Sequence, residues 1–142
     1  RQRLTERRTA QTAAEPPAGD DDGVPIPSAV LITMVLGSIP WQDFLSGGRT
    51  AIDIFAAAVN RNGGDFRGAE RVLDLGCGCG RLARFGPKVT DAAYYGVDYN
   101  QRLVDWCAAN LQGKYAKNEL HPPLEFTTDY FDVVCLLSVF TH

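Results

Sequence analysis

A dense run of glycines between two structured segments constrains the fold of this chain more than any other feature. Gly76, Gly78 and Gly80 follow the apolar segment 71–75 and precede the segment 81–85, which has helical character. Glycine adopts positive φ and lets a ligand approach the backbone, and the start of the next helix presents free N–H groups. This order of strand, glycine-rich turn and helix therefore predicts a ligand-binding turn at the carboxyl end of a strand.

The second half of the chain is predicted to alternate between strands and helices. Four segments are predicted strands: 71–75, 94–98, 115–117 and 132–137. The last of these is apolar without alternation, which is typical of a strand that is covered on both faces of a parallel sheet. We therefore expect an α/β fold, in which a doubly wound, mostly parallel sheet is flanked by helices.

The helices are predicted from apolar spacing and from residues that start or stop a helix. In the second half they cover 81–85, ended by Gly86-Pro87, and 101–111, capped by Asn100. Residues 24–64 are predicted to be an N-terminal helical segment. Its parts are an apolar stretch at 29–36, which is either helix or strand, a first turn at 41–45, a break at Gly47-Gly48 and a helix over 49–60.

Composition excludes several classes of protein. Residues 1–23 have no apolar periodicity and are predicted to be a disordered tail. The 14 Lys and Arg against 17 Asp and Glu give a net charge of −3, which disfavours a broad nucleic-acid surface. No apolar run is long enough for a membrane span. Four cysteines without paired spacing indicate buried, reduced thiols in the cytoplasm rather than a metal site.

The acids around the glycine run indicate which ligand it suits. A dinucleotide fingerprint would have its third glycine where this chain has Arg81, and Asp74 lies two residues before the first glycine. A carboxylate at Asp74 would repel a phosphate but suits a cationic amine. Asp98 ends the next predicted strand, where a carboxylate accepts ribose hydroxyls, and Tyr99 beside it could stack on a purine. The pattern predicts a ligand with an ammonium group and no phosphate.

Three blocks of sequence together resemble the class I S-adenosylmethionine-dependent methyltransferases. They are 72–80 with the glycine run, Gly96-Val97-Asp98, and 131–134 followed by 138–142; the segment 44–49 is also similar to the region before the core in one group of these enzymes. The resemblance implies a Rossmann-like fold and an S-adenosyl-L-methionine cofactor. It also implies that residues 65–142 are the cofactor-binding half of a domain truncated at its C-terminus.

The resemblance further implies which residues contact the cofactor. Asp74 and the glycine run would hold the methionine portion, Asp98 the ribose and Asn118 the adenine, while Leu137 and Ser138 would line the reactive methyl. The cofactor-binding residues that it predicts are Asp74, Gly76, Cys77, Gly78, Gly80, Asp98, Tyr99, Asn118, Leu137 and Ser138.

The expected activity is methyl transfer from S-adenosylmethionine to a small-molecule acceptor. No catalytic residue is predicted. Two alternatives stay open at this point: an NAD(P)-dependent oxidoreductase with an irregular loop, and an S-adenosylmethionine-binding module without turnover.

Overall fold

A four-stranded parallel sheet forms the centre of the protein. The structure is a computed structural model that describes residues 13–137 and residue 139. The strands are β1 (Arg71–Leu75), β2 (Ala93–Asp98), β3 (Lys114–Lys117) and β4 (Val133–Leu136). Their order is β3-β2-β1-β4, and every neighbouring pair is parallel. The predicted α/β fold with a parallel sheet is therefore confirmed, and the order of the strands reverses between β1 and β4.

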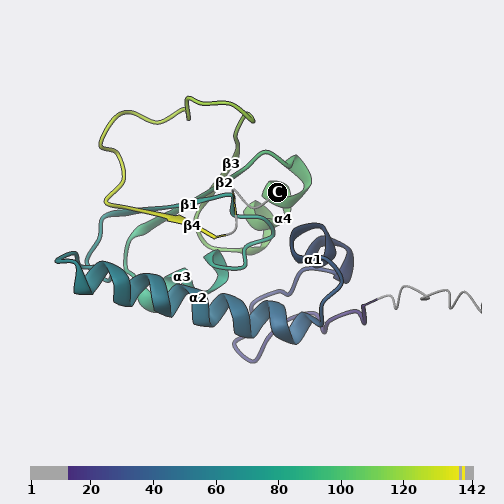
Figure 1. Cartoon of the computed structure of the whole chain (residues 1–142). Coiled ribbons are helices and arrows are strands. Elements are labelled where there is room, and N and C mark those ends of the chain that lie inside the picture. Colours follow the sequence, from purple (N-terminus) through teal and green to yellow (C-terminus); the bar gives the residue numbers. More distant parts are fainter. Residues whose placement is uncertain (1–12, 138, 140–142) are drawn as a thin grey trace, which may run out of the picture.

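The helices lie mainly along one face of this sheet (Figure 1). They are α1 (Ala29–Leu36), α2 (Trp41–Arg61), the 3₁₀ turn η1 (Ala83–Phe85), α3 (Gly86–Val89) and α4 (Gln101–Asn110). The predicted cap of α4 is present, because the side chain of Asn100 accepts a hydrogen bond from the N–H of Arg102. The stretch 29–36, for which the sequence left helix or strand open, is a helix.

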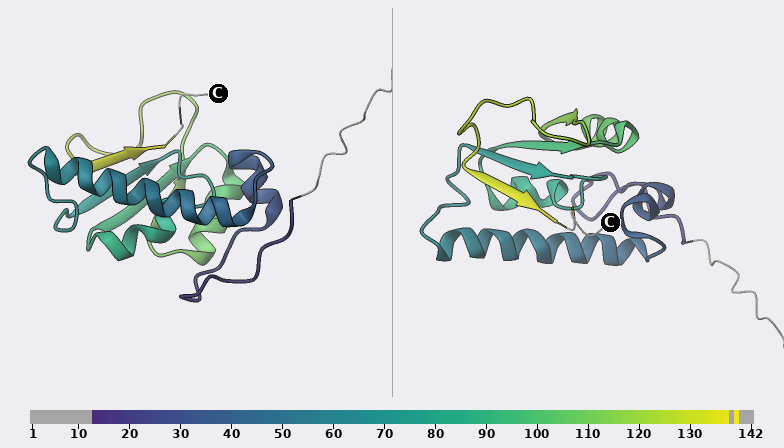
Figure 2. Two further views of the ribbon diagram at one scale, coloured as in Figure 1. Left: turned by 60° about the horizontal axis from the view of Figure 1, so that its bottom comes forward. Right: turned by 45° about the horizontal axis from the view of Figure 1, so that its top comes forward.

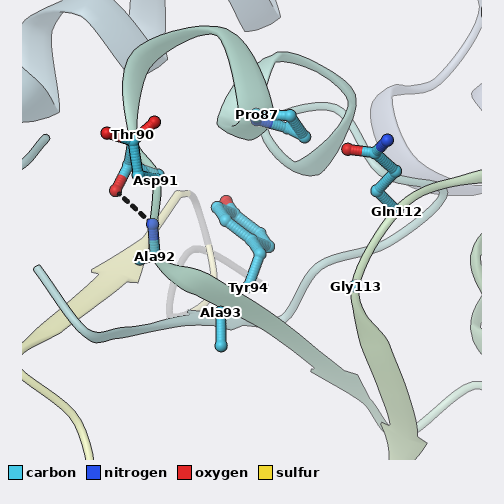
Figure 3. A pocket seen from close by; sticks show the side chains of 8 residues that line it. All are labelled: Pro87, Thr90, Asp91, Ala92, Ala93, Tyr94, Gln112 and Gly113. Atoms are coloured by element: carbon cyan, nitrogen blue, oxygen red, sulfur yellow. Dashed lines mark hydrogen bonds between the residues drawn. The ribbon is translucent and has the colours of Figure 1, made fainter.

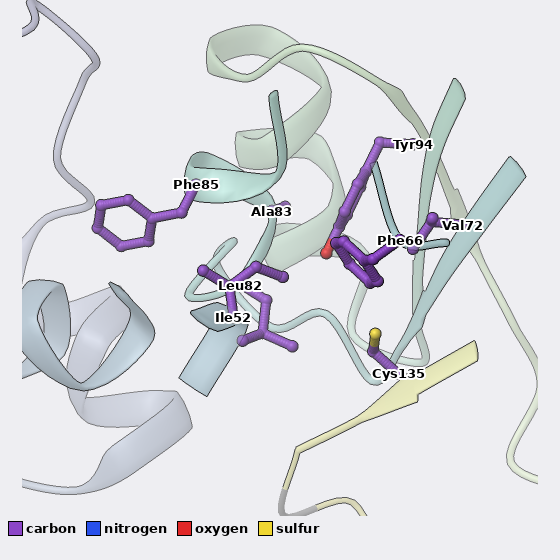
Figure 4. Close-up of a cluster of buried hydrophobic side chains, with 8 residues drawn as sticks. All are labelled: Ile52, Phe66, Val72, Leu82, Ala83, Phe85, Tyr94 and Cys135. Atoms are coloured by element: carbon purple, nitrogen blue, oxygen red, sulfur yellow. The ribbon is translucent and has the colours of Figure 1, made fainter. Parts of the chain in front are cut away.

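The main hydrophobic core lies between α2 and the sheet (Figure 4). Ile52 of α2 and Phe66 are fully buried against Val72 of β1, Tyr94 of β2 and Cys135 of β4. Burying one large apolar side chain contributes about 1.5–3 kcal/mol. This cluster therefore fixes α2 across the sheet, including β1, whose carboxyl end leads into the glycine run.

The other face of the sheet is covered by an aromatic loop instead of a helix. The segment 118–132, which joins β3 to β4, arches over that face (Figure 2). Its residues Phe126, Tyr130 and Phe131 pack around Tyr95 of β2 with ring centroids 4.7–6.0 Å apart. The Tyr95 and Tyr130 hydroxyls lie 2.8 Å apart and form a hydrogen bond. This loop leaves part of β4 bare, where Val134 and Leu136 are exposed.

The predicted break at Gly47-Gly48 is wrong, because α2 continues without interruption from Trp41 to Arg61. The two glycines are explained by a neighbour far away in the sequence. A β-carbon added to Gly48 would overlap the carbonyl oxygen of Arg81. Glycine at this position therefore lets the helix pass close to the backbone that follows the glycine run, and tertiary packing outweighs the weak helix propensity of glycine.

Gly48→Ala is expected to lower the free energy of unfolding by about 1–3 kcal/mol, because the added methyl meets rigid backbone. Gly47→Ala is the matched control, since its β-carbon would meet only the end of the Arg81 side chain, which can move aside. Urea unfolding followed by circular dichroism measures both variants. Equal stability of the two variants would contradict the close approach at Gly48.

Two further predictions of local structure differ from the observed chain. The helix predicted over 81–85 is a turn followed by η1, and Gly86-Pro87 begins α3 rather than ending a helix, because proline fits the first helical turn. Of the predicted disordered tail, residues 1–12 lie outside the described residues. Residues 19–25 instead form an antiparallel bridge between Gly19 and Pro25. A buried ion pair, described below, supplies the stabilisation that the sequence pattern did not reveal.

Within the described residues no single helix is both long and apolar enough to cross a bilayer. The pair α1 and α2 together meets the length and composition criteria, but the two helices are bent by 55° at the break between them.

Candidate functional site

The glycine run forms a tight loop at the carboxyl end of β1. Gly76, Gly78 and Gly80 have φ values of 75°, 54° and 82°, in the left-handed region that disfavours residues with side chains. The N–H groups of Gly76 and Cys77 both donate to the carbonyl of Val97 in β2, at 2.8 and 2.9 Å. The loop is thus fixed to the neighbouring strand in the conformation that the spacing of its glycines predicted.

Asp98 joins the loop to the end of β2. One carboxylate oxygen accepts the N–H of Gly78 at 2.9 Å, and the other accepts the N–H of Asn100 at 2.9 Å. The residue is 8% exposed. Each carboxylate oxygen has two acceptor positions, so both oxygens keep capacity for a further donor such as a ribose hydroxyl. The acid therefore holds the glycine loop while keeping an acceptor for a ligand.

Asp74 is a buried carboxyl group next to this loop. It is 2% exposed, and within the described residues it accepts one side-chain hydrogen bond, a long one of 3.4 Å from the Tyr94 hydroxyl. Burial raises the pKa of Asp74 to about 7; the hydrogen bond from Tyr94 opposes this rise and the charge of Asp98 adds to it. A carboxylate with so few partners would gain from a nearby cationic group.

Three thiols surround the loop from inside the protein. The Cys107 and Cys77 sulfurs lie 3.4 and 3.7 Å from the carbonyl oxygen of Gly78, and both donate to it. A hydrogen bond with Cys107 and burial raise the pKa of the Cys77 thiol well above its usual range, and burial raises the pKa of Cys79 to about 12. Cys77 and Cys79 are therefore protonated packing groups and not reactive thiolates.

Apolar side chains from two segments that are distant in the sequence pack against the loop. The sequence patterns did not predict this contact. A β-carbon built on Gly78 would lie 3.0 Å from a methyl of Val35 in α1. One built on Gly76 would lie 2.7 Å from a methyl of Val139, which follows β4. A continuous apolar stretch at 29–36 was visible in the sequence, but nothing in it indicated that this stretch would meet the glycine run.

The remaining predicted site residues differ in their distance from the loop and in their exposure. Tyr99 follows Asp98 and is 59% exposed at the carboxyl edge of the sheet. Asn118 follows β3; its backbone N–H donates to the Asp98 carbonyl, and its side-chain amide donates to the Glu119 carbonyl. Leu137 packs partly buried against the main core. Ser138 lies outside the described residues.

Two hollows on the described surface lie away from this loop. One is lined by Pro87, Tyr94 and Gln112 and lies near the amino end of β2 (Figure 3). Another is lined by Val59, Glu70 and Asp132 near the start of β1. Within the described residues no group of three or more His, Cys, Asp or Glu side chains is arranged to hold a metal ion. The features of the loop that suit a ligand are its backbone geometry and the two acids beside it.

Residues 72–142, which include β1, the loop and Asp98, match the model of the methyltransferase domain family. The chain belongs to this family. The match begins inside β1 and covers half of the chain.

A solved methyltransferase structure shares this fold, and a second solved methyltransferase is also similar to part of the chain. A putative S-adenosyl-L-methionine-dependent methyltransferase from Methanococcus maripaludis is 16% identical, with a TM-score of 0.57, over 70% of this chain and 46% of that one. Magnesium protoporphyrin IX methyltransferase from Synechocystis PCC 6803, solved with bound SAH, is 21% identical, with a TM-score of 0.49, over 71% of this chain and 47% of that one. The chain thus spans less than half of each of these structures.

Proposed function

We propose that the protein binds S-adenosylmethionine at the carboxyl ends of β1 and β2 and transfers its methyl group to a small-molecule acceptor. The observation that carries the proposal is the hydrogen bond from the Gly78 N–H to Asp98. This bond joins a loop of glycines with positive φ to a buried acid whose carboxylate oxygens can each accept a further hydrogen bond. Membership of the methyltransferase domain family supports it.

The residues of the site fit such a cofactor. Asp74 is a buried carboxyl with one long hydrogen bond, and a cationic amine would stabilise its charged form. Asp98 keeps acceptor positions on both carboxylate oxygens for two hydroxyls. When bound, S-adenosylmethionine supplies an electrophilic methyl group on its sulfonium.

The contribution of the protein would be orientation. The loop is fixed by bonds from Gly76 and Cys77 to Val97 and from Gly78 to Asp98, so it does not need to be ordered when the ligand arrives. Holding two reactants in line contributes up to roughly 7–11 kcal/mol in favourable reactions. A small-molecule acceptor in the cytoplasm is part of the proposal; the net charge of −3 and the buried, unpaired cysteines support it.

Calorimetry with S-adenosylhomocysteine tests the proposal directly. The chain is expected to bind S-adenosylhomocysteine and to give no heat of binding with NADH, because Asp74 disfavours a pyrophosphate beside the loop. Binding of NADH alone would identify an oxidoreductase instead.

Turnover is tested by transfer of radiolabelled methyl from S-adenosylmethionine to a library of small-molecule acceptors. Labelled product is expected. Binding of S-adenosylhomocysteine without transfer to any acceptor would instead indicate a binding module without turnover.

A further inference from the structure

The segment before α1 is attached to the rest of the protein by a buried charge. We define residues 15–28 as the N-terminal strap; it leads into α1 (Figure 2). Its turn is closed by Asp20, whose side chain accepts the N–H groups of Asp22 and Val24 at 3.0 and 2.9 Å. The N–H of Ile26 donates back to the carbonyl of Ala18 at 3.1 Å. The strap is therefore a hydrogen-bonded turn with a defined shape.

Arg84 of η1 holds this turn. Its side chain is 0% exposed and pairs with Asp20 at 2.8 Å. It also donates to the carbonyls of Pro25 and Val24 at 2.9 and 3.2 Å. A buried guanidinium is costly unless it is paired and hydrogen-bonded, so the strap supplies the partners that let Arg84 lie inside the protein. The guanidinium pair also lowers the pKa of Asp20, whose burial opposes that effect.

The far end of the strap sets the position of α1. The carboxylate of Glu15 accepts the N–H of Ala29, the first residue of the helix, at 3.1 Å, and Ser28 caps the same helix. Both bonds satisfy N–H groups that have no partner within a helix. The start of α1 is thereby fixed to the strap and, through it, to Arg84.

α1 in turn backs the glycine loop. Its residue Leu31 accepts a hydrogen bond from the Cys79 thiol at 3.7 Å, and Val35 lies against Gly78. Leu31 and Ile32 are buried in one cluster with Cys79. Arg84 is only four residues beyond Gly80, and its own N–H donates to the Gly80 carbonyl at 3.1 Å. The loop therefore contacts α1 directly and is also hydrogen-bonded to Arg84, the residue that anchors the strap before α1.

We propose that Arg84 is a positioning residue for cofactor binding: through the strap it holds α1 against the glycine loop and keeps the loop in its binding conformation. This inference rests on the proposed function. It assigns a role in the site to a segment that lies outside the family match, which begins at residue 72. Arg84 itself does not touch the ligand.

Asp20→Asn in the full chain tests the inference. The amide keeps an oxygen to close the turn but removes the charge that pairs with Arg84. The variant is expected to remain folded and to bind S-adenosylhomocysteine about tenfold more weakly, because the loop is held less firmly before binding. Arg84→Lys, which keeps the charge but not the geometry of several donors, is expected to show an intermediate loss. Calorimetry gives the affinities, and circular dichroism confirms folding.

A second measurement separates positioning from general stability. Hydrogen exchange of amides 76–80 is expected to speed up in Asp20→Asn, while exchange in β1 and β2 stays unchanged. Arg67→Ala is the matched control, since Arg67 pairs with Asp91 at 3.4 Å on the exposed surface. A folded Asp20→Asn variant with unchanged affinity and loop exchange would overturn the inference. Failure of the unmodified chain to bind S-adenosylhomocysteine would instead overturn the proposed function.

Discussion

Asp98→Ala is expected to weaken S-adenosylhomocysteine binding by about 1–3 kcal/mol, about a fivefold to 150-fold rise in Kd. The substitution removes the acceptor that we propose for the ribose hydroxyls. It also leaves the N–H groups of Gly78 and Asn100 without their partner, so that the glycine loop loses its bond to the end of β2. Calorimetry measures the affinity directly.

The matched control for this substitution is Asp105→Ala. Asp105 is an exposed acid on α4 that accepts a hydrogen bond from Gln101, so its removal changes the net charge equally without touching the loop. Asp98→Asn keeps one acceptor oxygen and is expected to fall between the wild type and Asp98→Ala. An Asp98→Ala protein that is folded and binds with unchanged affinity would remove Asp98 from the site.

The stability of the protein is expected to fall as the pH rises, because of Asp74. Burial raises the pKa of this carboxyl from 3.8 to about 7 in the folded protein. The unfolded chain therefore releases the proton first, and the stabilisation present below pH 3.8 is lost progressively as the pH rises through 7. Between pH 5 and pH 8 the contribution of Asp74 is expected to fall by about 2–3 kcal/mol.

Asp74→Asn removes this titration. Urea unfolding at pH 5 and pH 8 is expected to show a flatter pH dependence in Asp74→Asn than in the wild type. Asp53→Asn serves as control, because Asp53 is an exposed acid paired with Arg49 on α2. Parallel stability curves for the wild type and Asp74→Asn would contradict a raised pKa of the Asp74 carboxyl.

Much of the sheet and part of the site were predictable, because their signals are local. Apolar runs gave β1, β2 and β4, and Asn100 marked the start of α4. The approach of Asp74 to Asp98 follows once the two strands are parallel neighbours, since Asp74 pairs with Gly96 two residues before Asp98. The positions of the two acids at the ends of neighbouring strands therefore follow directly from the sequence.

The features that were missed depend on partners far away in the sequence. From the sequence alone, Gly48 indicates a helix break. Its real role becomes clear only in the fold, where the backbone of Arg81 lies directly against it. The sequence around Asp20 is typical of a disordered segment. It forms a turn because the buried Arg84 pairs with Asp20 in the folded protein. Likewise, a short apolar stretch does not reveal that Val35 will rest on Gly78. Local periodicity carries no information about these contacts, because they arise only when the chain is folded.

The close passage of α2 over Arg81 has a consequence for how such a sequence can diverge. A glycine inside a helix costs about 1 kcal/mol relative to alanine, so Gly48 runs against the preference of its own helix. A descendant that replaced Gly48 with a larger residue would need a compensating shift of the chain after Gly80. Position 48 and the exit of the loop are therefore expected to evolve as a coupled pair.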